Sequence, residues 1–152
     1  MEEHTAFWYF AHNKVVMTTI LAWFIAQTIK VAIGAIREKR FNFKWFVGTG
    51  GMPSSHVAGV TALATCVGIQ EGVGTALFAT TLAFTTVVIC DAQGVRWATG
   101  KQAEILNKIM EDIYWKKKIQ EDRLMELIGH TPIQVFAGMA VGLAVGLISY
   151  YL

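Results

Sequence analysis

Long apolar segments dominate this chain, and they constrain its fold more than any other feature. Four of them run over residues 15–36, 53–69, 73–90 and 133–152, and most charged side chains lie between them. A helix needs about 20 apolar residues to cross the hydrocarbon core of a bilayer, and only the segment over 53–69 is clearly short. The pattern predicts an all-α integral membrane bundle, with four transmembrane helices in one domain over residues 1–152.

The composition agrees with membrane insertion. Hydrophobic residues make up 54% of the chain and charged residues 16%, whereas about a quarter of the residues in a soluble domain are charged. The net charge of +2 is too small to predict nucleic-acid binding. The two cysteines, Cys66 and Cys90, lie in apolar segments. We expect them to be small core residues rather than a disulfide or a metal site.

The connecting segments predict the orientation of the chain in the membrane. Four spans place residues 37–52 and 91–132 on one side, and these two segments hold nearly all the lysines and arginines. The positive-inside rule therefore makes this side cytoplasmic in a multi-pass protein of the cell membrane. Both termini and the short turn at 70–72 are expected on the opposite side. Aromatic residues at 7–10 and 150–151 suit a headgroup region.

Residues 101–127 are expected to contain an amphipathic helix. Ile105, Ile109 and Ile113 recur at helical spacing, and Glu104 and Lys108 form an i,i+4 pair. Such a helix would lie on the membrane surface or over a site, or it would pack against the cytoplasmic ends of the bundle. The sequence alone leaves these alternatives open.

Polar side chains gather at one end of the predicted bundle. Such residues are costly inside a membrane or at its edge, and they often have a function. The four spans bring six of them to the loop side: Lys30, Arg37, His56, Asp91, Arg96 and His130. Each has an ordinary interpretation when taken alone, such as a snorkelling lysine, a helix cap or an ion pair between Asp91 and Arg96. Their agreement across the whole chain indicates a site.

Two of the predicted helices begin alike. Residues 50–56 read GGMPSSH and residues 129–133 read GHTPI. Each start has a glycine, a histidine, a hydroxyl and a proline near the first helical position, where proline costs no hydrogen bond. The free amides and the dipole of a helix start bind anions. We expect an anion cradle in which Gly51 allows close approach of the backbone and Ser54 and Ser55 supply hydroxyls.

The cations nearby predict that the anion is a phosphate. Lys30, Arg37 and Arg96 are the expected partners of its oxygens. Two histidines beside a phosphate suggest phosphoryl transfer, in which one imidazole attacks phosphorus and the other protonates the departing oxygen. Asp91 is expected to hold the attacking imidazole in the right tautomer. No cofactor or metal is expected, because a single carboxylate among cations is a poor ligand set for a divalent ion. Whether Asp91 orients the imidazole or binds a divalent metal is left open by the sequence.

These residues resemble the motifs of the type 2 phosphatidic acid phosphatases, whose site is shared with the vanadium haloperoxidases. That superfamily carries K-x6-R-P, P-S-G-H and S-R-x5-H-x3-D. The first motif resembles Lys30 to Arg37, with Glu38 in place of proline. The second resembles residues 53–56, PSSH, and the third ends at His130, with Gln134 in place of aspartate.

The arginine of the third motif is out of register in this chain. Arg123 lies one residue too far from His130, so Arg96 in DAQGVR is the candidate replacement. The blocks GGMPSSH, DAQGVR and GHTPIQVFAG together resemble a divergent branch of the superfamily, made of small membrane proteins. The superfamily has a six-helix core, whereas four spans are expected here.

The resemblance implies a metal-independent phosphatase that acts on a lipid phosphate or a prenyl (pyro)phosphate. His130 would be the nucleophile that forms a phosphohistidine, and His56 would be the general acid. The phosphoryl oxygens would be held by Lys30, Arg37, Ser54, Ser55 and Arg96. The substitution at Gln134 removes the usual partner of the nucleophilic imidazole, and our hypothesis is that Asp91 takes this role.

Two alternatives remain open at this stage. The first is a non-catalytic protein that binds lipid headgroups, with Gln134 marking lost activity. The second is a transporter or an assembly subunit. Gly138, Gly142 and Gly146 recur at i,i+4 spacing and allow close helix packing, either within the chain or across a homodimer.

Overall fold

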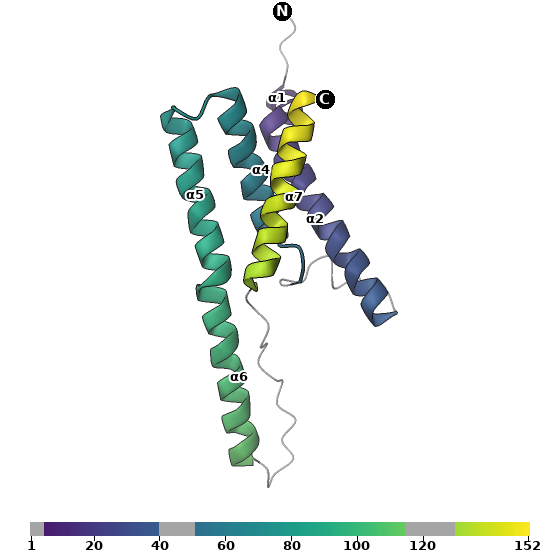
Figure 1. The fold of residues 1–152 in the computed structure, drawn as a ribbon, viewed down its shortest axis with the longest axis vertical. Coiled ribbons are helices and arrows are strands. Elements are labelled where there is room, and N and C mark those ends of the chain that lie inside the picture. The colour runs from purple at the N-terminus through teal and green to yellow at the C-terminus, as the bar shows by residue number, and fades with distance from the viewer. Residues whose placement is uncertain (1–4, 40–50, 115–129) are drawn as a thin grey trace, which may run out of the picture.

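The computed structural model describes residues 5–39, 51–114 and 130–152, and all regular structure in these ranges is α-helical. Figure 1 shows the helices side by side, with α1 and the C-terminal end of α7 at one end of the bundle. In chain order the helices are α1 (Ala6–Ala11), α2 (Lys14–Glu38), α4 (Ser55–Gln70), α5 (Ala76–Gln93), α6 (Val95–Tyr114) and α7 (Pro132–Tyr151). The predicted all-α membrane bundle is confirmed for the described part of the chain.

Helix α4 is the centre of the bundle, because it contacts α2, α5 and α7. Its buried positions include Ala58, Gly59, Ala62 and Ala64, and small residues of this kind let neighbouring helices approach closely. Two apolar clusters tie the bundle together. One joins α2, α4 and α7 around Ala62, and the other joins α4, α5 and α7 where Val57, Ala92 and Val135 meet.

Three helices are long and apolar enough to cross a membrane: α2, the helix over Ala76–Met110 that begins with α5, and α7. The span expected at 53–69 differs from this group. It forms α4, which has 16 residues and is about 24 Å long, whereas a bilayer core is about 30 Å thick. By length and composition, three of the four expected spans correspond to candidate membrane helices, and the fourth is a shorter central helix.

Apolar side chains on the outside of the bundle are exposed, as expected for a surface that faces lipid. Phe24, Phe84, Val87 and Phe136 are all more than half exposed. Threonine hydroxyls in the same helices donate to the carbonyl four residues earlier, so they need no water in the hydrocarbon region. Thr85 also bonds across helices, because its hydroxyl lies 3.1 Å from the Val60 carbonyl of α4.

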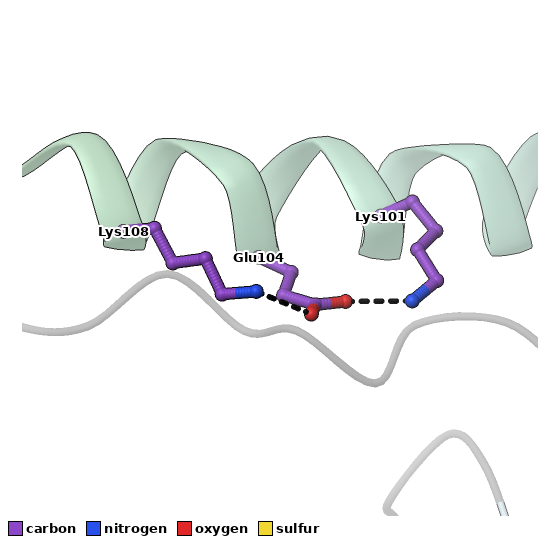
Figure 2. A network of polar contacts seen from close by, with 3 residues as sticks. All are labelled: Lys101, Glu104 and Lys108. Carbon is purple, nitrogen blue, oxygen red and sulfur yellow. Dashed lines mark hydrogen bonds and ion pairs between the residues drawn. The ribbon is translucent and has the colours of Figure 1, made fainter.

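Helix α6 continues the direction of α5 beyond Gly94 and extends past the other helices (Figure 1). The predicted i,i+4 pair is present, since Lys108 lies 3.2 Å from Glu104, and Lys101 lies 2.7 Å from the same carboxylate (Figure 2). Among the described residues, α6 contacts α5 but not α2, α4 or α7. Packing across the ends of the bundle, one of the open alternatives, is therefore not seen for residues 101–114, and residues 115–127 lie outside the described ranges.

The glycines of α7 face α4 within the same chain. A Cβ atom built at Gly138 would lie 2.6 Å from the Ser54 carbonyl oxygen, and one at Gly142 would collide with the Ala58 carbonyl oxygen. A Cβ atom at Gly146 would lie 2.8 Å from Thr65 Cβ. The three glycines therefore serve helix packing within one chain. Because α4 covers the glycine face, a homodimer would need a different surface.

The contact between α4 and α7 predicts the effect of adding a single methyl group. Gly142→Ala forces the two backbones apart and should lower the free energy of unfolding by about 1–3 kcal/mol. The measurement is thermal unfolding of the detergent-solubilised protein. Gly74→Ala is the matched control, because a Cβ atom there meets nothing within 4 Å. Equal melting temperatures for the two variants would contradict this packing.

Candidate functional site

The C-terminal half of α2 carries a buried lysine. The Lys30 side chain is 8% exposed. Its Nζ atom donates to Gln27 Oε1 at 3.0 Å and to Ser55 Oγ at 3.4 Å. An ammonium group in an apolar interior is costly unless polar partners surround it, so these two oxygens stabilise Lys30 where it lies. Lys30 therefore faces the bundle and does not snorkel outward.

The start of α4 lies against this lysine. Ser54 is the N-cap residue, and its hydroxyl accepts from the Val57 amide at 3.4 Å, as expected for a helix that begins with serine. Gly51 has φ +86°, and a Cβ atom there would lie 3.1 Å from Lys30 Cγ. A side chain at position 51 would thus be both strained and crowded. The space beside Gly51 is filled by the aliphatic part of Lys30, and the predicted approach of its backbone to an anion stays a prediction.

The start of α7 is joined to the same place by two backbone hydrogen bonds. The Ser54 amide donates to the Gln134 carbonyl at 3.0 Å, and the His130 amide donates to the Ala92 carbonyl at 3.1 Å. The His130 side chain is 1% exposed. The apolar cluster that joins α4, α5 and α7 includes Ala92, whose carbonyl accepts one of these bonds. Both predicted helix starts therefore meet the end of α5 at one end of the bundle (Figure 1).

Part of the predicted site is thus assembled. Lys30, Ser54, Ser55 and His130 are buried at this end, and we call these four residues the candidate site. Asp91 is half-buried and directly precedes Ala92, whose carbonyl accepts from the His130 amide. Among the described residues, no group of three or more His, Cys, Asp or Glu side chains is arranged to hold a metal ion.

Two predicted site residues, His56 and Arg37, are placed away from these four, and a third is not described. His56 lies in the first turn of α4 but is exposed, unlike Ser54 and Ser55 beside it. Arg37 is exposed near the end of α2, about 10 Å along the helix axis from Lys30, and this end of α2 points away from the other helices (Figure 1). The side chain of Arg96 lies outside what the structure describes.

The side chain of Gln134 closes the first turn of its own helix. Its Oε1 atom accepts from the Thr131 amide at 3.0 Å, and Thr131 is the N-cap residue of α7. A glutamine three residues after the cap satisfies an amide that would otherwise have no partner inside the helix. The Gln134 oxygen is therefore used for capping.

Comparison with known proteins shows the family of this chain. The model of a family described as "Divergent PAP2 family" matches residues 11–145, which include every residue of the candidate site. This chain belongs to the divergent PAP2 family. The chain is also 36% identical over 150 residues to "Uncharacterized membrane protein YuiD" of Bacillus subtilis (strain 168), an alignment that covers 91% of this chain and 95% of that protein. No solved structure matches the chain.

Membership of the divergent PAP2 family confirms the resemblance drawn from the three motifs, and the relative supports a multi-pass membrane protein. One contact was missed at the sequence level. No motif singles out Gln27, yet it is the nearer of the two oxygen partners of the Lys30 ammonium. The i,i+3 spacing of the two residues was the available signal.

The capping contact predicts how α7 responds to substitution of Gln134. Gln134→Ala removes the acceptor for the Thr131 amide and should cost about 1 kcal/mol of unfolding free energy. Gln134→Glu keeps an acceptor and places negative charge at a helix start, so its melting temperature should match that of the wild type. Thermal unfolding in detergent measures both. An equal loss for the two variants would show that the side chain does not act as a cap.

Proposed function

We propose that this protein is an integral-membrane phosphatase that hydrolyses a lipid phosphate or a prenyl (pyro)phosphate. The observation that carries the proposal is the ammonium of Lys30, which is buried 3.4 Å from the Ser55 hydroxyl at the start of α4. A fixed cation and the free amides of a helix start together stabilise the negative charge of a phosphoryl group. Family membership supports the same chemistry.

The proposed reaction has two steps. The imidazole of His130 attacks phosphorus, the bond from phosphorus to the ester oxygen breaks, and a proton from His56 passes to the departing alcohol. Water then attacks the phosphohistidine and passes a proton back to His56, and the phosphorus–nitrogen bond breaks, which releases inorganic phosphate and restores both imidazoles. Lys30 and Ser55 hold the phosphoryl oxygens in both steps. The burial of His130 and Ser55 strengthens these electrostatic contacts, because little water screens them.

The exposure of His56 fits its proposed role. The departing alcohol carries the lipid tail, so it lies on the outer side of the site, where an exposed imidazole in the first turn of α4 can protonate it. We assign Asp91 the task of orienting the His130 imidazole. The Gln134 oxygen is already used for capping, and Asp91 adjoins the residue that binds the His130 amide.

A second candidate function is non-catalytic binding of lipid phosphate headgroups. The observation that favours it is the capping role of Gln134, which stands where the superfamily has an aspartate. The cradle formed by Lys30, Ser55 and the start of α4 would serve binding as well as catalysis.

Release of inorganic phosphate decides between these functions. Detergent-solubilised protein is given phosphatidic acid, phosphatidylglycerophosphate and undecaprenyl phosphate in separate reactions. The wild type should release phosphate from at least one of them, and His130→Ala should lower turnover roughly 1000-fold or more. His12→Ala is the matched control, because His12 is exposed near the opposite end of the bundle. Binding of a lipid phosphate by the wild type without release would favour the second function.

The same assay tests the role of Asp91. Asp91→Asn should lower turnover roughly 100-fold or more while expression stays normal, because an amide cannot stabilise the imidazolium as a carboxylate does. Turnover close to that of the wild type would remove Asp91 from the mechanism.

We further propose that the candidate site faces the cytoplasm. The segments 37–52 and 91–132 connect helices on the side of the site, and they hold most of the lysines and arginines. Thr5→Cys and Lys101→Cys are made separately in a chain without Cys66 and Cys90; both positions are exposed. A thiol reagent that does not cross membranes should label the cysteine at position 5 in intact cells. It should label the one at position 101 only in broken cells. The reverse pattern would place the site on the outer side.

A further inference from the structure

Gln27 is a polar residue on the face of α2 that packs into the bundle. The residues buried on this helix are Thr18, Ala22, Ala26, Gln27, Lys30 and Val31. The Gln27 side chain is 2% exposed, although an amide in an apolar interior is costly without hydrogen bonds. Its Oε1 atom accepts from Lys30 Nζ at 3.0 Å, a shorter distance than the 3.4 Å from Nζ to Ser55 Oγ.

This contact fixes the direction of a flexible side chain. A lysine ammonium has three N–H donors on a four-carbon stem with many rotamers. Gln27 and Ser55 accept two of the three hydrogens, and they hold the ammonium between α2 and the start of α4. Within the described residues the Lys30 ammonium makes these two hydrogen bonds. Its third hydrogen can therefore bind an anion at the start of α4.

The acceptor is also uncharged, and this determines what the ammonium can bind. A carboxylate at position 27 would hold Lys30 at least as firmly, because hydrogen bonds between charged groups are the stronger ones. It would also neutralise the lysine, and an incoming anion would then meet a neutral ion pair. A glutamine amide positions the ammonium and leaves its positive charge for the ligand.

We propose that Gln27 is a positioning residue, which fixes the Lys30 ammonium toward the start of α4 and keeps its charge available to a tetrahedral oxyanion. The inference rests on the proposed function, in which this oxyanion is the phosphoryl group of a lipid. The same ammonium and helix start would bind a free inorganic oxyanion such as tungstate. Binding of the free oxyanion and turnover of the lipid phosphate can therefore be measured separately.

Two substitutions separate charge from position. Gln27→Glu keeps an acceptor but cancels the lysine charge, so tungstate binding, measured by calorimetry on the full detergent-solubilised chain, should weaken at least tenfold. The KM for the lipid phosphate should rise with it. Gln27→Met has similar size and no comparable acceptor, so the ammonium stays charged but loses its fixed direction. It should lower kcat about tenfold and change tungstate affinity less.

Gln70→Glu is the matched control, because it makes the same chemical change at an exposed position near the opposite end of α4. It should leave tungstate binding and turnover unchanged. A residue that only fills space would give the same loss for Gln27→Glu and Gln27→Met, in proportion to lost stability, so that result would overturn the positioning role. Wild-type behaviour of both variants would overturn it as well.

The two proposals fail in different ways. If the wild type binds tungstate but releases phosphate from no tested lipid, the proposed phosphatase is wrong, and the tungstate affinities of Gln27→Glu and Gln27→Met still decide the role of Gln27. If the wild type turns over a lipid phosphate and both variants match it, only the inference about Gln27 is wrong. A wild-type protein that neither binds tungstate nor releases phosphate overturns both. Should Gln27→Glu fail to fold, the kcat of Gln27→Met decides the positioning role.

Discussion

The close contact between α4 and α7 is the constraint on which the rest of the structure depends. The α7 glycines leave no room for side chains, so the backbones of the two helices approach directly. This approach brings the Ser54 amide to the Gln134 carbonyl and sets the two helix starts beside each other. α2 and α5 then pack on α4, and they carry Lys30 and Ala92 to the same end. The candidate site is a product of helix packing rather than of one loop.

The sequence was sufficient for features that depend on long apolar segments. α2, α5 and α7 were predicted from hydropathy, and the grouping of Lys30, Ser54, Ser55 and His130 followed from counting spans. The short helix α4 was also expected from the short apolar segment over 53–69, whereas the direction of α6 was harder to predict. Helical periodicity tells which side of a helix is apolar, but it does not tell how far the helix extends beyond its neighbours or what covers it.

Side-chain partners were the least predictable part of the site. Gln134 was recognised as a departure from a motif, yet its use as a cap depends on one rotamer and on the exact start of α7. Gln27 was visible as a neighbour of Lys30, but its contact at 3.0 Å depends on burial that packing creates. Ser55 and His56 are adjacent in sequence, and they differ in exposure because successive residues of a helix face different directions. Such details follow from three-dimensional contacts that no single sequence contains.

The shortness of α4 determines how deep its first residues lie within the bundle. With 16 residues, α4 is roughly 6 Å shorter than a typical hydrocarbon core. Its C-terminal end lies at the level of α1 and the chain terminus, where aromatic side chains favour the headgroup layer (Figure 1). Because α2, α5 and α7 pack around α4, its start lies inside the bundle, at a depth short of the headgroups of the other leaflet. An anion held there would sit deeper than the phosphates of the surrounding lipids, so a ligand would have to sink into the protein to reach it.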